Sequence, residues 1–273
     1  MKKYINPYTE CGFRKLFGED SSKVLLIDFL NQLLPAHHQI TSIYFDDIQD
    51  EMFHYEYYHS NFDIYCTANN GIQFIIELKN EINSHFKEKA LFNIANLIRK
   101  NVETKYWNYE LNFIYHISMI DFFYEKHYHA KYYRHVDFKD QFNENFYSKL
   151  SMIYLQIPAF NKNENEITSK LDKWIYFLKY LDKFNDVPAL LNEPIFLKAF
   201  KIADISLLSP TQLHEYEKSK LNYLDILNIC HNAKAEGIKE RNFEIAKLMK
   251  INGEPIENIA QYTGLSIEII NQL

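Results

Sequence analysis

Residues 62–80, FDIYCTANNGIQFIIELKN, have the pattern of a β-hairpin and decide how the rest of the chain is interpreted. Asn69, Asn70 and Gly71 are typical of a three-residue hairpin loop that is closed by a glycine at positive φ. With Asn70 at the apex, Asp63 lies directly opposite Glu77. The two-residue period of a strand then places Lys79 on the same face as Glu77.

The register of this hairpin is restricted by its apolar pattern. A two-residue turn would shift the pairing by one residue and set the apolar face of one strand beside the polar face of the other, which is costly. In the favoured register one face is a core, formed by Phe62, Ile64, Cys66, Phe74, Ile76 and Leu78. The other face carries Asp63, Tyr65, Thr67, Gln73, Ile75, Glu77 and Lys79.

Two carboxylates at directly paired positions need a compensating charge. Their Cβ atoms are about 4.5–5.5 Å apart, and like charges at that distance repel. A magnesium ion would offset the repulsion, since Mg²⁺ is commonly held by one or two carboxylates together with substrate phosphates. The alternative is a solvated sheet face with an ordinary ion pair between Glu77 and Lys79.

Composition limits the classes of protein that fit. The 273-residue chain is 47% hydrophobic and carries a net charge of −6, so any contact with DNA must depend on a local basic patch or a metal. Its three cysteines lie far apart, which suggests neither a disulfide framework nor a zinc site and favours a reducing cytoplasm. The strongest early apolar run is broken by Asp28 and is too short to span a bilayer. We therefore expect a cytoplasmic protein without a membrane segment.

Helix and strand patterns alternate around the hairpin. Apolar spacing predicts a short helix that ends near Gly18, a buried helix within residues 21–35, and a long amphipathic helix that follows Ser84. A buried strand within residues 111–121 comes next, so the hairpin, helix and strand form a βαβ-like crossover. With further strands near 131–138 and 149–158, the fold class is α/β or α+β, with a mixed central sheet flanked by helices.

The C-terminal part reads as helical. A polar stretch at residues 161–165 suggests a core domain over residues 1–160 and a helical region over 161–273. In the tail, Ala260 and Gly264 have the spacing of a helix-turn-helix, and Ser266 is a natural cap for the second helix. That helix contains Glu268 and no Lys or Arg, which favours a packing or homodimer-forming element over base reading.

Three histidines form a second candidate set of metal ligands. His127, His129 and His135 follow one another in a tyrosine-rich segment. Their spacing fits surface or DNA-contacting residues better than a set of metal ligands.

Several segments together resemble a known family. They are TECGFRKLFG (residues 9–18), the hairpin, KALFNIANLIRKN (89–101), the strand after it, and IAKLMKINGEPIENIAQYTGLSIEII (245–270). In this order they are similar to the recombination-promoting nuclease or putative transposase family of the PD-(D/E)XK superfamily. The hairpin supplies the motif, in which thirteen residues separate Asp63 from Glu77 and one separates Glu77 from Lys79.

The resemblance implies a restriction-endonuclease-like core and a set of site residues. Asp63 and Glu77, with the backbone carbonyl of Leu78, would hold Mg²⁺, for which Mn²⁺ may substitute, and Lys79 would position or activate a water. The metal would neutralise phosphate charge and lower the pKa of bound water. Glu10 matches the acidic position before the FRKLFG segment, which implies a supporting, water-mediated metal contact.

Two departures from the family pattern concern the site. Many relatives carry Gln at the position of Lys79, so this chain is closer to the full superfamily motif. A Gln often found later in the long helix corresponds here to Asn101, which puts its role in doubt. Lys87 and Lys89, earlier in that helix, either contact DNA phosphates or belong to a solvated helix face.

The resemblance therefore implies a Mg²⁺-dependent DNA endonuclease that acts in recombination or in the transposition of mobile DNA. One alternative is a non-catalytic, nuclease-derived DNA-binding or regulatory protein. A decayed site is expected to lose Asp63, Glu77 or Lys79, and the presence of all three favours the enzyme. Another is an unrelated α/β binding protein with an ion-paired hairpin, which requires a different fold.

Overall fold

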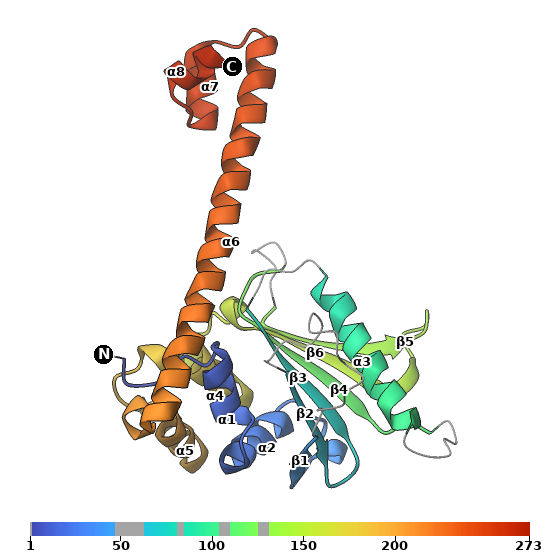
Figure 1. Ribbon diagram of the computed structural model, residues 1–273. Coiled ribbons are helices and arrows are strands. Elements are labelled where there is room, and N and C mark those ends of the chain that lie inside the picture. Colours follow the sequence, from blue (N-terminus) through green and yellow to red (C-terminus); the bar gives the residue numbers. More distant parts are fainter. Residues whose placement is uncertain (1, 47–62, 81–84, 104–109, 125–130) are drawn as a thin grey trace. The chain divides into compact units, whose positions relative to one another are not determined.

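The computed structural model describes residues 2–46, 63–80, 85–103, 110–124 and 131–273 (Figure 1). Four residues named in the sequence analysis lie outside these ranges, namely Phe62, Ser84, His127 and His129. By its internal contacts the chain forms two compact units, one up to Tyr223 and one from Leu224 to Leu273. The domain boundary expected at residue 160, where the nuclease-like core would end, stays a prediction.

The first unit is built on a six-stranded mixed sheet. Its strands are β1 (Ile43–Phe45), β2 (Asp63–Ala68), β3 (Gln73–Lys79), β4 (Ile114–Ile120), β5 (Tyr133–Lys139) and β6 (Asn145–Gln156), in the order β1-β2-β3-β4-β6-β5. The central strands β3, β4 and β6 are parallel, and the outer pairs are antiparallel. The predicted mixed sheet is thereby confirmed. The short edge strand β1 was not predicted.

The hairpin of β2 and β3 has the predicted register. Asp63 pairs with Glu77, and Thr67 pairs with Gln73. Gly71 has a φ of 80°, and its N–H donates to the Ala68 carbonyl oxygen at 2.9 Å. Since this left-handed conformation is readily adopted by glycine, the Asn-Asn-Gly loop fixes which residues pair across the hairpin.

Helices cover both faces of the sheet. After β3 the chain crosses over through α3 (Phe86–Glu103) before the parallel strand β4. Figure 1 shows α3 on one face, and α1 (Glu10–Phe17), α2 (Lys23–Asn31), α4 (Lys170–Tyr180) and α5 (Pro194–Ala203) on the other. Two buried clusters follow this division, one around Phe74, Ile76 and Leu78 and the other around Ile75 and Ile94. Both faces of β3 are therefore buried.

Aromatic rings join the early and late helices into a single core. The Phe17 and Phe29 ring centroids lie 5.2 Å apart, and Phe29 packs edge-on against Trp174 at 5.7 Å. Trp174 in turn packs against Phe196 of α5 at 4.9 Å. Helices α4 and α5 consequently belong to the same packed unit as α1 and α2.

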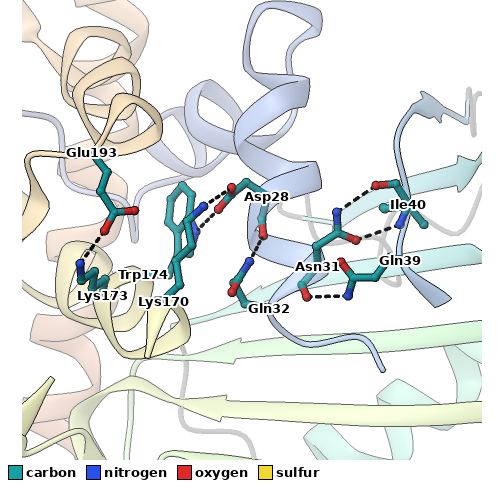
Figure 2. Close-up of polar contacts among 9 residues, drawn as sticks. All are labelled: Asp28, Asn31, Gln32, Gln39, Ile40, Lys170, Lys173, Trp174 and Glu193. Atoms are coloured by element: carbon teal, nitrogen blue, oxygen red, sulfur yellow. Dashed lines mark hydrogen bonds and ion pairs between the residues drawn. The ribbon is translucent and has the colours of Figure 1, made fainter. Parts of the chain in front are cut away.

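Polar contacts fix α2 against α4 (Figure 2). The indole Nε1 of Trp174 donates to Asp28 Oδ1 at 2.8 Å, and Lys170 Nζ lies 2.5 Å from the other carboxylate oxygen. At the last residue of α2, the Asn31 side chain exchanges two hydrogen bonds of 2.9 Å with the backbone of Ile40. These bonds set the position of the chain that leads into β1.

Asp28→Ala is expected to lower the free energy of unfolding by about 1–3 kcal/mol, because it leaves the buried indole N–H of Trp174 without its acceptor. Chemical denaturation monitored by tryptophan fluorescence measures the change. Glu193→Ala is the control, since it removes a partly exposed ion pair with Lys173 (2.5 Å) and should cost less than about 1 kcal/mol. Equal losses in the two variants would contradict this assignment.

The second unit is helical. It contains the later part of α6 (Pro210–Ile251), α7 (Ile256–Thr263) and α8 (Ile267–Gln272), packed around Ala246, Ile259 and Ile270. Gly264 ends α7 with a φ of 69°, and Ser266 caps α8 by accepting from Ile269 N at 3.4 Å. The preference for a packing or homodimer-forming role over base reading stays a prediction. Of the helices in the described ranges, none combines the length and apolar character needed to cross a membrane.

Candidate active site

A row of polar residues crosses the sheet beneath α3. Strand pairing aligns Asp63 on β2 with Glu77 on β3, Ser118 on β4, Tyr154 on β6 and Arg134 on β5. Each of these five strands therefore contributes one polar side chain to the same line. The row lies on the face covered by α3, among apolar residues of β3, β4 and β6.

Glu77 is the centre of this row and has no exposed surface. Lys79 Nζ lies 2.8 Å from Glu77 Oε2, and His116 Nε2 lies 3.2 Å from the same oxygen. The side-chain amide of Asn93 donates to the other oxygen, Oε1. Three side chains from β3, α3 and β4 thus hold this carboxylate.

These contacts keep Glu77 ionised despite its burial. Burial by itself raises the pKa of a carboxyl group, because it disfavours the charged form. The hydrogen bond and charge of His116, and then those of Lys79, outweigh burial and lower the pKa of Glu77 well below its ordinary value. At neutral pH the site therefore contains a buried carboxylate anion.

Asp63 faces the same space from the opposite strand. It is half-buried, and its Oδ2 atom is fully covered. Burial raises the pKa of Tyr65, and the charges of Asp63 and Glu77 raise it further, so both carboxylates act on one phenol. Burial and the charge of Glu77 likewise raise the pKa of Tyr154 to about 12. The alternative of a solvated sheet face is wrong, although the Glu77–Lys79 ion pair that it included is present.

Asn93 and His116 were not predicted as site residues. Asn93 lies on the apolar face of α3 and is only 2% exposed, and His116 is fully buried in the otherwise apolar start of β4. Ser118 Oγ lies 3.5 Å from His116 Nδ1. Polar side chains at buried positions of a helix and a strand are the signal that identifies both residues, because such groups require partners.

Glu10 lies in the first turn of α1 and takes no part in the contacts of Glu77 described above. Burial raises the pKa of Glu10, and the charges of Arg14 and Lys218 partly offset that effect. Two residues before Glu10, the Tyr8 carbonyl oxygen accepts from Asn80 Nδ2, just after β3, at 3.4 Å. A role for Glu10 at the metal stays a prediction.

The expected DNA-contacting residues of α3 have different surroundings. Lys87 is exposed and its Nζ lies 5.4 Å from the centre of the Tyr124 ring, whereas Lys89 is half-buried. Asn101 exchanges two amide hydrogen bonds with Gln73 on β3, of 2.7 and 3.2 Å. Asn101 therefore ties the end of α3 to the sheet. Contact of these residues with DNA stays a prediction.

His135, the described member of the three histidines, pairs with a neighbour on β5. Its Nε2 lies 3.1 Å from Asp137 Oδ1, and both side chains are partly exposed. This contact fits the surface role that was favoured over a metal cluster.

The oxygen donors of the hairpin fit a divalent cation. Asp63 and Glu77 present carboxylates from directly paired positions, and Glu77 is held as an anion. Oxygen ligands of this kind are those that Mg²⁺ prefers. Among the described residues, no group of three or more His, Cys, Asp and Glu side chains forms a metal site. Further ligands would have to come from backbone, such as the Leu78 carbonyl, and from water or phosphate.

A protein-family model described as PD-(D/E)XK nuclease family transposase matches residues 7–233. No curated protein and no solved structure matches the chain. The matched range contains α1, the hairpin, the crossover through α3 and the whole sheet, and it ends within α6. The family supports a nuclease-type hydrolase as the general class. The chain belongs to the PD-(D/E)XK nuclease family of transposases.

Proposed function

We propose that the protein is a Mg²⁺-dependent DNA endonuclease that hydrolyses phosphodiester bonds in the recombination or transposition of mobile DNA. The observation that carries this proposal is the convergence of Asp63, Glu77 and Lys79 on one covered face of the hairpin, with Asp63 paired to Glu77 and Lys79 Nζ 2.8 Å from it. Family membership supports the same reaction class.

In this proposal, Asp63, Glu77 and the Leu78 carbonyl would hold Mg²⁺, or Mn²⁺ in its place. Such an ion supplies charge neutralisation at phosphate and a lowered pKa for bound water. Glu10 would assist through a water, and it has the weaker support because the charges that act on it are those of Arg14 and Lys218.

The residues around the carboxylates have distinct tasks. Asn93 and His116 fix the orientation of Glu77, which keeps one carboxylate rotamer in place before substrate arrives. Lys79 holds its ammonium beside the carboxylate, from where it can orient the attacking water by hydrogen bonding. Lys87 and Lys89 would contact DNA phosphates, and Asn101 would hold α3 over the site through Gln73.

One feature favours the non-catalytic alternative. Both oxygens of Glu77 already have protein partners, since Oε1 accepts from Asn93 and Oε2 lies within ion-pair distance of Lys79 and His116. In a binding protein derived from a nuclease these contacts would be permanent. In an enzyme a cation must displace at least one of them.

Nicking of supercoiled plasmid tests the proposal. The purified chain should convert supercoiled plasmid to nicked or linear DNA with Mg²⁺ and with Mn²⁺, and EDTA should stop the conversion, because the opposed carboxylates act through a cation. DNA retardation in a gel without cleavage under any of these conditions would support the binding protein instead. Cleavage that persists in EDTA would contradict the metal-dependent mechanism.

A further inference from the structure

A second group of charged side chains lies on the other face of the sheet. It surrounds a cavity of about 250 Å³ where β4 and β6 end. The titratable residues of its lining are Tyr8, Asp121, Lys179, Asp182, Lys183 and Tyr223. Asp121 N donates to the Lys79 carbonyl oxygen at 2.9 Å, so the cavity begins directly behind the end of β3. In open α/β sheets, the carboxyl ends of the strands are the usual place for ligands.

The aspartates of the cavity are already partnered. Asp182 forms an ion pair with Lys2. Asp121 accepts a hydrogen bond of 2.6 Å from the Tyr223 hydroxyl, and burial raises the pKa of Asp121 to about 6. Lys2 therefore balances the charge of Asp182, and Asp121 is the one carboxylate of the lining whose charge can act on Lys179 and Lys183.

The two lysines of the lining, Lys179 and Lys183, outnumber the one aspartate, Asp121, that has no lysine of the described ranges in an ion pair with it. Lys179 Nζ donates to the carbonyl oxygens of Pro158 at 3.3 Å and Phe160 at 2.5 Å, which fixes its position. Within the described part of the chain, no carboxylate lies at ion-pair distance from Lys179 or Lys183. The lowered pKa of Lys179, caused by burial and then by the charge of Lys183, agrees with two cations facing a common space. An anion is the ligand that this charge would attract.

Tyr8 gives the independent sign of a ligand. Its side chain is 7% exposed, and its buried hydroxyl has no hydrogen-bond partner among the described residues. Tyr8 belongs to the lining of the cavity together with Asp121, Asp182 and Tyr223, and the charges of these three groups, after burial, raise the pKa of its hydroxyl. Buried polar groups in proteins almost always have partners, and an unpartnered one costs folding free energy.

We propose that this cavity binds a small phosphate monoester, whose phosphate group contacts Lys179 and Lys183 and accepts a hydrogen bond from the Tyr8 hydroxyl. The Asp121 carboxyl distinguishes phosphate from other anions. A phosphate monoester has a second pKa near 6 and can share a proton with a carboxylate, whereas sulfate carries no such proton and is repelled. The charged or titratable groups that act on Asp121 are Tyr223, Asp182, Lys183 and Tyr8.

The monoester has two possible sources, a free nucleotide or the 5′-phosphorylated end of a DNA strand. Isothermal titration of the full chain in EDTA compares them, and EDTA prevents phosphate binding through a cation at Asp63 and Glu77. The probes are dAMP, deoxyadenosine, inorganic phosphate, sulfate, and a short single strand with a 5′-phosphate or a 5′-hydroxyl. We expect binding to require the phosphate group, and sulfate to bind at least about tenfold more weakly than phosphate.

Two variants assign the binding to the cavity. Tyr8→Phe should weaken binding of dAMP or of the phosphorylated strand by about tenfold without lowering the melting temperature, because the hydroxyl lost has no protein partner. Asp121→Asn should remove the preference for phosphate over sulfate. Tyr176→Phe is the matched control, since its hydroxyl donates to Glu164 Oε1 at 2.7 Å outside the cavity, and it should leave binding unchanged.

The results separate a site from a structural cluster. Phosphate-dependent binding that is weakened by Tyr8→Phe supports the proposal. Whichever of dAMP and the 5′-phosphorylated strand binds more tightly then identifies the source of the monoester. Absence of phosphate-dependent binding overturns it. Equal affinity of the parental chain and Tyr8→Phe, or a lower melting temperature of Tyr8→Phe with unchanged affinity, overturns it as well.

Discussion

Asp63→Asn is expected to reduce Mg²⁺-dependent DNA cleavage by about 10³-fold or more, the scale seen when a group that stabilises charge in the transition state is removed. The same variant should unfold at or above the parental temperature. It removes a like charge opposite Glu77, while Lys79, His116 and Asn93 remain bound to Glu77. Plasmid nicking and thermal unfolding on one preparation measure both effects.

Asp46→Asn is the matched control for this variant. Asp46 is a half-buried carboxylate beside β1, and Thr67 Oγ1 donates to it at 3.0 and 3.1 Å. An amide oxygen can still accept from Thr67, so cleavage should stay at the parental level. Cleavage by Asp63→Asn at a rate close to that of the control would remove Asp63 from the mechanism. Glu77→Gln is a less clean test, because it leaves the buried ammonium of Lys79 without its counter-ion.

Lys79→Ala should lower the single-turnover rate of DNA cleavage by about 10²–10⁴-fold, the usual contribution of a positioned proton donor or acceptor. Affinity for Mg²⁺ should not fall, because a lysine cannot ligate a cation and both carboxylates remain. The affinity for Mg²⁺ should instead rise, because in the parental chain the ammonium lies 2.8 Å from Glu77 Oε2 and competes with the cation for that oxygen. Rapid-quench cleavage and metal titration of the variant give the two quantities.

Lys198→Met, at an exposed position of α5, controls for the loss of one positive charge. It should change neither the cleavage rate nor the affinity for Mg²⁺. If Lys79→Ala cleaves at the parental rate, Lys79 acts solely as the counter-ion of Glu77. If it loses Mg²⁺ affinity and cleavage together, the lysine supports the metal site and has no separate part in the reaction.

The pairing of Asp63 with Glu77 could be predicted because it depends on local sequence. Asn69, Asn70 and Gly71 determine the loop, the loop determines the register, and the alternating pattern excludes a shift by one residue. The crossover and mixed sheet followed from a helix pattern between two strand patterns. These parts of the fold need no knowledge of distant contacts.

The partners of Glu77 depend on distant contacts and were not predicted. Asn93 reaches the carboxylate only once α3 has docked, and His116 only once β4 has paired with β3 in the observed parallel register. Nothing in the local pattern sets that register. The complete burial of Glu77 depends on the same distant contacts, since the hairpin alone gives the residue a face but not the helix that covers it. The three-residue strand β1 is too short to show any period.

The crossover that covers Glu77 also separates two events in time during folding. The hairpin joins neighbouring residues, and such structures form within about 1–10 μs. Pairing of β3 with β4 must wait for the intervening chain to close, which slows the step. Until then Glu77 and Lys79 face water, where an ion pair contributes little to stability. The strong part of their attraction arises only after α3 docks, so loss of this pair accelerates unfolding more than it slows folding.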